Sequence, residues 1–499
     1  MQNGQAGGVE GGVVSGAHAA DAVHHYEALA LAIVMLGVLM SAVDTTAVVL
    51  GLPVMIQDLH SNVISMIWVI MAYLLVITVF GTQVGKLGDI FGRVRMYNVG
   101  FAVFTAGSFL CGFSASGPEL IGFRVLQGAG GALISSNSGA IIADTFSEHR
   151  RGRAFGITGF GYSAGAILGI LVGGALVTFL SWRYIFFINI PIGIVATLAG
   201  YFILREGPDR SKGTVDFLGM GFFGLGLAIF LVALTDVSGS GLTLSSEAEL
   251  VGAIPLLAAF VLWERRSRSP LLDLSLLRRR VLTASMLAAF FQSLASFAVL
   301  FLVIMYLQGP RGLTPWDASL YLIPGYILGG GVAPFSGRLS DRYGARVVAS
   351  LGLLLQAGGI LTYSTLGIGS PLYVVVLASV LNGAGSSTYY PANNSAVMAN
   401  APRRAYGMAS GLLRTFSNVG MVCSFAVALL FASLAVPRRV AFEIFLGVAR
   451  ISGPLSQAFV DGLHSAMIAS IALLGVAVVL SALRGREART ESGGARPEA

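Results

Sequence analysis

The sequence is organised around the stretch Gly85-Lys86-Leu87-Gly88-Asp89-Ile90-Phe91-Gly92-Arg93-Val94-Arg95, which lies between two long apolar runs. This placement predicts a tight loop at a membrane surface, between two spanning helices. A stretch of the same design recurs 252 positions later as Gly337-Arg338-Leu339-Ser340-Asp341-Arg342-Tyr343-Gly344-Ala345-Arg346. The two share Gly, Leu, Asp and Gly at equal spacing, and each closes with Arg. This repetition predicts a chain built from two related halves.

The composition of the chain is that of a membrane protein. Of its 499 residues, 55% are hydrophobic and 11% are charged, against roughly 25% charged residues in a soluble domain. The mean hydropathy is +0.80, and apolar runs recur that reach the roughly 20 residues needed to cross a bilayer. We therefore expect an all-α, multi-pass protein whose surroundings are the lipid bilayer. The basic residues behind the net charge of +7 are scattered over short loops, so a nucleic-acid partner is not expected.

Fourteen apolar runs have the length of a spanning helix. They lie near 28–50, 63–83, 95–114, 118–142, 153–179, 183–204, 216–236, 248–264, 281–306, 318–335, 347–367, 371–391, 407–434 and 463–483. The loops after even-numbered spans, with the C-terminal tail, hold 24 of the 31 Lys and Arg residues. The positive-inside rule then predicts that these loops and both termini are cytoplasmic, with the protein in the inner membrane. The first basic residue is Lys86, so a cleaved signal peptide is not expected.

Two further segments support the repeat. The residues Arg153-Ala154-Phe155-Gly156-Ile157 are echoed at Arg404-Ala405-Tyr406-Gly407-Met408, and Val125-Leu126-Gln127-Gly128-Ala129-Gly130 at Val380-Leu381-Asn382-Gly383-Ala384-Gly385. Three segments at nearly one offset predict two six-span halves with two spans inserted between them, a 6 + 2 + 6 arrangement of parallel repeats. The expected divisions are a mobile N-terminal tail (1–27), a first half (28–204), an insertion (205–275), a second half (276–485) and a C-terminal tail (486–499).

The two repeated polar stretches are candidates for a conformational switch. Gly85 would let a neighbouring helix approach closely, Asp89 would cap the N–H groups at the start of the third span, and Arg93 would pair with acidic groups. The residues assigned to this switch are Gly85, Asp89, Gly92, Arg93, Gly337, Asp341 and Arg342. A role in topology alone is the simpler alternative. It explains the Arg residues, but it does not explain why Gly-x-Leu-x-Asp-x-x-Gly occurs twice.

The repeated stretch resembles the conserved loop motif of the major facilitator superfamily. Three further segments resemble its fourteen-helix drug:H+ antiporter branch. These are Ser41-Ala42-Val43-Asp44-Thr45-Thr46-Ala47-Val48-Val49-Leu50-Gly51-Leu52-Pro53, Arg124-Val125-Leu126-Gln127-Gly128-Ala129-Gly130-Gly131-Ala132 and Trp182-Arg183-Tyr184-Ile185-Phe186-Phe187-Ile188-Asn189-Ile190-Pro191-Ile192-Gly193. The resemblance covers about residues 28–485. It implies the major facilitator fold and export of amphiphilic small molecules, such as drugs, in exchange for protons.

Asp44 and Arg124 are the charged residues that point to proton coupling. An Arg inside a span costs several kcal/mol unless it is partnered or wetted, and its counterpart in the second half is Ser379. The resemblance implies that this Arg takes part in proton coupling. Asp44 is the one carboxylate well inside a span, where low dielectric favours protonation. Structural roles, an Arg paired with backbone carbonyls and a capping Asp near Pro53, are the alternatives. The sequence leaves open whether the two residues meet.

The fifth span departs from the family pattern. Gly165, Gly169, Gly173 and Gly174 keep the helix-packing glycines, but Ile170 stands where the family's antiporter motif has proline. Close helix packing is therefore expected without the kink of a proline. This departure leaves open whether the protein exports or imports its substrate.

The second half has no Asp or Glu in the middle of a span, which disfavours a dicationic substrate. Its neutral polar residues and one added arginine are candidates for a substrate cavity, although simple packing between helices is the alternative for each. The candidates are Gln292, Asn382, Tyr389, Tyr390, Arg414 and Asn418. A transporter of an endogenous metabolite, neutral or anionic, stays open as a second function.

Other classes of protein lack their signatures in this sequence. A Gly-x-x-x-x-Gly-Lys-[Ser/Thr] phosphate loop is absent. Clusters of His, Asp or Glu within the spans and a channel filter motif are also absent. We therefore expect neither an enzyme nor a channel, and neither a metal nor a cofactor. Cys111 and Cys423 fall inside apolar runs, so a disulfide is not expected. A monomer is expected.

Overall fold

The computed structural model describes residues 10–207, 214–267, 274–402, 406–437, 440 and 454–485, and they form helices joined by short turns. The first helices are α1 (Glu10–Asp58), α2 (Val63–Phe91), α3 (Arg93–Phe113), α4 (Gly117–Thr145), α5 (Glu148–Phe179), α6 (Tyr184–Phe187) and α7 (Asn189–Ile203). They are followed by α8 (Phe217–Ser240), α9 (Leu244–Glu264) and the short 3-10 helix η1 (Leu274–Arg278). The last are α10 (Arg280–Gln308), α11 (Pro315–Tyr343), α12 (Ala345–Tyr363), α13 (Tyr373–Asn400), α14 (Tyr406–Leu434) and α16 (Pro454–Leu483).

Within the described residues, twelve helical segments are long and apolar enough to cross a membrane. The expected spans near 118–142 and 371–391 coincide with α4 and α13, which have 29 and 28 residues. These two helices are long enough to cross but are not among the twelve, because polar residues such as Gln127 and Asn382 lower their hydropathy. An all-helical membrane fold is therefore confirmed.

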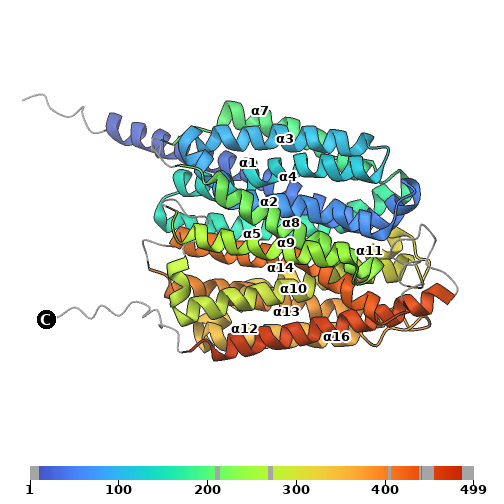
Figure 1. Cartoon of the computed structure of the whole chain (residues 1–499). Coiled ribbons are helices and arrows are strands. Elements are labelled where there is room, and N and C mark those ends of the chain that lie inside the picture. The colour runs from blue at the N-terminus through green and yellow to red at the C-terminus, as the bar shows by residue number, and fades with distance from the viewer. Residues whose placement is uncertain are drawn as a thin grey trace, which may run out of the picture.

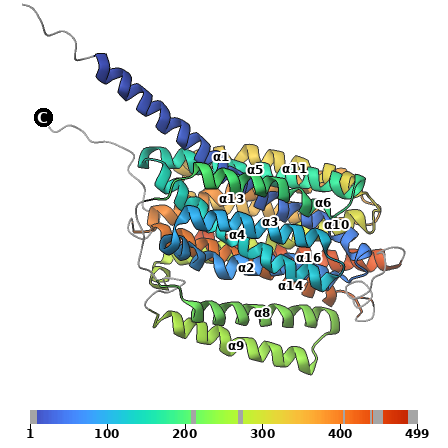
Figure 2. The same ribbon diagram turned by 90° about the horizontal axis from the view of Figure 1, so that it is seen from above.

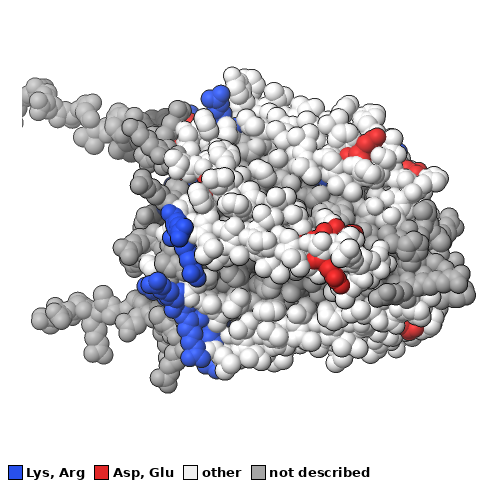
Figure 3. Space-filling view, viewed as in Figure 1, with Lys and Arg blue, Asp and Glu red and all other residues white. Residues whose placement is uncertain are grey.

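The helices run side by side as one bundle, with those of the first part of the chain on one side and α12, α13 and α16 on the other (Figure 1). In the perpendicular view, α8 and α9 lie together along one edge (Figure 2). Lys and Arg gather at one end of the bundle, while Asp and Glu lie toward the other (Figure 3). The basic end also carries the turns after α2 and α11 and is called the loop end below.

The internal repeat is visible in helix packing. In the first half, an added Cβ on Gly100 of α3 would come within 3.1 Å of the Gly130 carbonyl of α4. In the second half, an added Cβ on Gly352 of α12 would come within 2.9 Å of the Gly385 carbonyl of α13. Close approach of α3 to α4 and of α12 to α13 therefore depends on glycine at matched positions.

The two polar stretches that reveal the repeat are mostly helical, so the expectation of a loop over Gly85–Arg95 is wrong. Helix α2 runs to Phe91, and α3 begins at Arg93 after a single non-helical residue, Gly92, whose φ is +107°. Gly344 separates α11 from α12 in the same way, with a φ of +88°. Both turns need glycine, because this backbone conformation crowds a Cβ atom.

The expected capping role of Asp89 is also wrong, because Asp89 lies inside α2, before the turn. The N–H groups of Val94 and Arg95 instead donate to the carboxylate of Glu206, each at 3.1 Å. Close approach to α4 is made by Gly88, where an added Cβ would collide with the Asn137 side chain. At Gly85 it would make only an ordinary contact, 3.9 Å from Ser136.

From Glu10 onward, the N-terminal tail expected over 1–27 is helical and forms the first part of α1. Near its junction with the bundle, the Glu27 carboxylate accepts a hydrogen bond of 2.7 Å from Arg150 Nη1. This ion pair ties α1 to the start of α5. Residues 1–9 and 486–499 lie outside the described part of the chain.

The insertion is attached to the first half at both ends of α8. At the loop end, the Asp216 N–H donates to Gln83 Oε1 of α2 at 3.2 Å. At the opposite end, Trp68 Nε1 of α2 donates to Thr235 Oγ1 of α8 at 3.3 Å. Helix α8 also packs against α14 of the second half.

Candidate functional site

A buried ion pair lies in the first half, between α1 and α4. Arg124 Nη1 donates a hydrogen bond of 2.6 Å to Asp44 Oδ2. The two side chains are 1% and 0% exposed, so neither charge is compensated by bulk water. The question that the sequence leaves open, whether these two residues meet, is answered by their position on facing helices.

Neutral side chains complete the hydrogen bonds of the pair. Gln127 Nε2 and Asn189 Nδ2 both donate to Asp44 Oδ1, at 2.8 and 3.2 Å. Arg124 also donates to Gln127 Oε1 at 2.6 Å and to the Val69 carbonyl at 3.1 Å. A buried charged pair is tolerated only when its remaining donors and acceptors are used in this way. The carboxylate and the guanidinium therefore form one connected polar network.

Gln127 and Asn189 lie within motifs of the sequence, but their role becomes apparent only in the structure. Gln127 could have been recognised, since it lies three residues after Arg124 and therefore on the same face of a helix. Asn189 begins α7 after the short helix α6, and its side chain reaches Asp44. Tyr73 was also missed; its ring lies 4.0 Å from the Arg124 guanidinium carbon.

A central cavity of about 300 Å³ lies beside the ion pair, mostly within the second half. Helices α1, α2 and α5 of the first half contribute Thr45, Thr46, Val49, Ile70, Leu74, Tyr162, Ser163 and Ala166. Helices α10 and α11 contribute Gln292, Ser296, Phe297, Val299, Leu300, Leu322, Gly325, Tyr326, Gly329 and Gly330. Helices α12 to α14 contribute Gln356, Tyr363, Ser379, Asn382, Gly383, Ser386, Ser387, Tyr390 and Phe425. Among these described residues, none is Asp, Glu, Lys, Arg or His.

Three of the six residues assigned to the cavity line it, namely Gln292, Asn382 and Tyr390. The other three, Tyr389, Arg414 and Asn418, are outside its lining. Tyr389 is fully buried between helices, with its ring 5.7 Å from that of Tyr390. Arg414 Nη1 of α14 approaches the Ser135 carbonyl of α4 at 3.5 Å, a contact between the two halves.

The glycines of the fifth span pack against both halves. An added Cβ on Gly165, Gly169 or Gly173 would come within 2.8 Å of α1 atoms, or closer. At Gly174 it would come within 3.0 Å of the Pro315 carbonyl of α11. The N–H of Trp316 donates to Thr178 Oγ1 nearby at 3.0 Å. These contacts join α5 to α11 at the end of the bundle away from the loop end.

The same two helices leave space toward the loop end. An added Cβ on Gly159 of α5 or on Gly330 of α11 would meet no atom within 4 Å. Gly330 also lines the cavity. At these glycines, α5 and α11 are therefore closely packed on the side away from the loop end and less closely packed toward the loop end.

The switch residues of the first half form an ionic network at the loop end. Arg93 lies 2.8 Å from Asp89 of α2 and 2.6 Å from Asp144 of α4. In the second half, Gly337 lies within α11, and the Arg342 guanidinium lies 5.4 Å from the centre of the Tyr343 ring. The Asp341 side chain lies outside the described part of the structure.

A helical bundle of two repeated halves, with a central cavity and a buried ion pair beside it, defines a membrane transporter. The sequence profile of the Major Facilitator Superfamily matches residues 34–425 and 332–498, so the chain belongs to that superfamily. The motif-based resemblance to this superfamily is therefore confirmed, as is the expectation that the protein is a transporter and not an enzyme.

Curated relatives span most of the chain. The riboflavin transporter RibZ of Clostridioides difficile is 30% identical over 406 residues, which are 81% of this chain and 87% of RibZ. The tetracenomycin C resistance and export protein of Streptomyces glaucescens is 32% identical over 391 residues, 78% of this chain and 72% of that protein.

A similar solved structure is that of a bacterial homologue of the human lysosomal transporter Spinster, in an inward-facing and unoccupied conformation. It has a TM-score of 0.68 at 17% identity and covers 92% of this chain and 97% of its own. This similarity establishes the fold.

Proposed function

We propose that the protein is a proton-coupled exporter of amphiphilic compounds in the cytoplasmic membrane, working by alternating access as a monomer. The observation that carries the proposal is the buried Asp44–Arg124 pair beside an uncharged cavity. One helix joins the two, since Asp44 is followed in α1 by Thr45 and Thr46, which line the cavity. A change in the charge of Asp44 can thus reach the substrate through the backbone of α1.

The coupling step follows from the hydrogen bonds of the pair. A proton that binds the Asp44 carboxylate neutralises it and removes the charge from its bond with Arg124 Nη1. Arg124 then keeps the Gln127 Oε1 and Val69 carbonyl acceptors. The weakened α1–α4 contact favours a rearrangement of α1, and loss of the proton restores the pair. Alternating access would follow as the two halves rock about the cavity.

The architecture proposed with this function is the 6 + 2 + 6 arrangement of fourteen spans, which counts α4 and α13 among the spanning helices. The domain boundaries expected from the sequence, with both termini cytoplasmic, belong to the same proposal. In that orientation the loop end faces the cytoplasm, and the closed contact of Trp316 with Thr178 faces outward. The cavity would then be in its cytoplasm-facing state.

Transport of an endogenous metabolite is the second candidate function. The relative named a riboflavin transporter favours it, because RibZ is matched over 87% of its length. The uncharged cavity lining favours a neutral metabolite over an anionic one.

Proteoliposomes that hold the purified chain test proton coupling. An imposed pH gradient should drive accumulation of an amphiphilic drug, and added drug should collapse a pre-formed gradient. The Asp44→Asn variant should lose gradient-driven transport and keep drug-for-drug exchange across the membrane, since the cavity is unchanged. If the pH gradient drives transport of no drug in a broad panel, the proton-coupled mechanism is wrong. If the wild-type protein exchanges drug across the membrane but does not respond to the gradient, it is a facilitator that moves its substrate without protons.

A further inference from the structure

We propose that the cavity selects uncharged aromatic compounds that carry hydroxyl or carbonyl groups on one edge, and that Asn382 and Ser296 receive that edge. This inference rests on the transport function proposed above and names the substrate class of the same cavity. Its basis is the chemistry of the lining, its repeat relationship to the ion-pair site and two polar atoms without protein partners.

The lining combines aromatic surface with neutral hydrogen-bonding groups. Its aromatic residues come from six helices and are Tyr162, Phe297, Tyr326, Tyr363, Tyr390 and Phe425. Such rings favour a flat apolar guest, since aromatic pairs stack or meet edge to face. The volume of about 300 Å³ lies at the lower end of ligand pockets. A compact, fused-ring molecule fits this combination better than a long flexible chain.

The repeat places Asn382 where the first half has Gln127. An added Cβ on Gly107 would meet the Gln127 backbone, and one on Gly359 would meet the Asn382 backbone in the same way. The Gln127 amide is occupied by Asp44, Arg124 and Ser108, since its Oε1 accepts from Arg124 and its Nε2 donates to Asp44 and Ser108. The second half has Ser379 in place of Arg124, so the Asn382 amide faces a neutral cavity instead of an ion pair.

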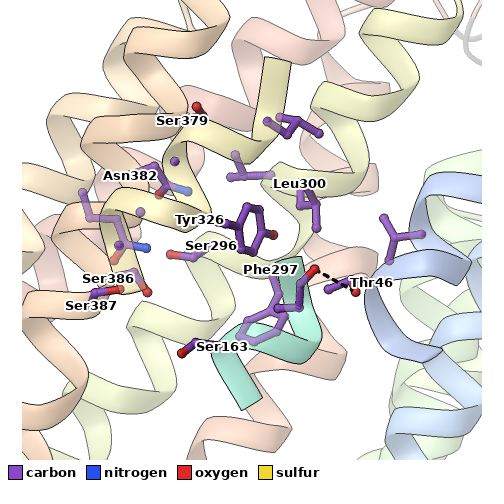
Figure 4. Close-up of a pocket in the computed structure, with 18 of the residues that line it drawn as sticks. Thr46, Ser163, Ser296, Phe297, Leu300, Tyr326, Ser379, Asn382, Ser386 and Ser387 are labelled. Carbon is purple, nitrogen blue, oxygen red and sulfur yellow. Dashed lines mark hydrogen bonds between the residues drawn. The ribbon is translucent and has the colours of Figure 1, made fainter. Parts of the chain in front are cut away.

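Two buried polar atoms of the cavity lining lack partners for hydrogen bonds. Among the described residues, neither Asn382 Oδ1 nor Ser296 Oγ has a protein partner. Figure 4 shows both side chains directed into the same part of the cavity, with the Tyr326 ring close by. A buried acceptor without a donor costs about 1–3 kcal/mol, so a guest with a hydroxyl or N–H group at this edge is favoured. Ser296 Oγ can also donate to a carbonyl oxygen.

The lining gives a cation no counter-charge. The nearest carboxylate in the sequence of α1, Asp44, is already bound to Arg124, Gln127 and Asn189. Moving a cation from water into a site without a paired anion is unfavourable. The surrounding aromatic faces attract a cation with about 0.5–2 kcal/mol. This attraction opposes the cost of moving the cation out of water, and a binding measurement shows which of the two is larger.

Binding of two fluorescent probes to the purified full chain in detergent tests the inference. Quinizarin, a hydroxylated anthraquinone that is uncharged near neutral pH, represents the proposed class, and ethidium is a flat aromatic cation. We expect quinizarin to bind at least about tenfold more tightly than ethidium. Equal or tighter binding of ethidium would overturn the proposed class, and so would failure of quinizarin to bind.

A carboxylate placed in the cavity should reverse the preference. The Asn382→Asp variant is expected to weaken quinizarin binding and to strengthen ethidium binding, each by about tenfold. The matched control, Asn400→Asp, lies 18 residues further along α13, outside the lining, and should leave both affinities unchanged. If the folded Asn382→Asp variant keeps the wild-type ratio of quinizarin affinity to ethidium affinity, the role of Asn382 is refuted. If Asn382→Asp does not fold, the Gln292→Glu variant, which also places a carboxylate in the cavity lining, takes its place.

The binding assay needs no proton gradient. Correct selectivity without gradient-driven transport would therefore refute the proposed coupling and keep the substrate class. Gradient-driven transport of ethidium in preference to quinizarin would refute the substrate class and keep the proposed coupling.

Discussion

Arg124 Nη1 lies 2.6 Å from Asp44 Oδ2, although 80 positions separate the two residues in the chain. Both are almost completely buried, and two neutral amides complete the hydrogen bonds of the carboxylate. Each buried charge is therefore compensated by the other, and the folded protein is destabilised when only one of them is removed. Its repeat counterpart in the second half is uncharged, so the two halves have the same packing and different chemistry.

Removing one member of this pair should cost more stability than removing both. Asp44→Asn leaves the Arg124 charge buried without its anion, and we expect it to lower the free energy of unfolding by about 3–5 kcal/mol. The double variant Asp44→Asn/Arg124→Gln should recover at least part of that loss. Thermal unfolding in detergent measures both. Additive losses in the double variant would show that the two charges do not depend on each other.

The network around Arg93 should affect the rate of the transport cycle. Asp89→Asn weakens one of the two ionic contacts of Arg93, 2.8 Å from Asp89 and 2.6 Å from Asp144. Both are partly exposed, so the effect on stability should be small. We expect slower turnover with nearly unchanged substrate affinity, measured by transport and by binding in parallel. Lost affinity at normal turnover would remove Asp89 from the switch.

The two glycine turns should tolerate no side chain. Gly92→Ala and Gly344→Ala place a Cβ on residues with φ of +107° and +88°, and each should cost about 1–2 kcal/mol. Gly337→Ala is the matched control, because Gly337 is helical with no atom within 4 Å of an added Cβ. It should be neutral or stabilising by up to about 1 kcal/mol. Equal melting temperatures of all three variants would contradict the strain argument.

The packing of α9 on the start of α8, within the insertion, should depend on pH through Asp216. Burial disfavours the charged form of its carboxyl, but the hydrogen bonds that it accepts and the charge of Lys86 outweigh burial and lower its pKa. Trp263 Nε1 and Ser267 Oγ, both 2.9 Å away, are among the donors. A lowered pKa in the folded state stabilises the fold above the ordinary Asp pKa of about 4, and this stabilisation is lost as the pH falls further.

The Asp216→Asn variant tests that linkage. Its deficit in melting temperature relative to the wild type should be constant between about pH 7 and 5 and should shrink below about pH 4. The difference between the two proteins isolates Asp216 from the other acids. A deficit that does not change on acidification would show that it does not come from the charge of the Asp216 carboxylate.

Apolar length and repeated motifs were enough to predict the class of fold from the sequence. They also identified the two polar turns as equivalent and singled out Asp44 and Arg124. The expected loop at Gly85–Arg95 and the cap by Asp89 were wrong, because helix α2 continues through Phe91. The cap comes instead from Glu206, more than 110 positions away, a distance at which sequence spacing contains no information about contact.

The sequence by itself determined which segments are apolar enough to enter a bilayer and that glycine recurs at Gly92 and Gly344. These are local properties, set by the transfer of side chains from water and by the steric limits of each backbone residue. Only the tertiary structure decided that Gln127 and Asn189 complete the site of Asp44 and that Asn382, rather than Arg414, lines the cavity. Those relationships depend on which faces of distant helices meet, and packing of the whole bundle sets them.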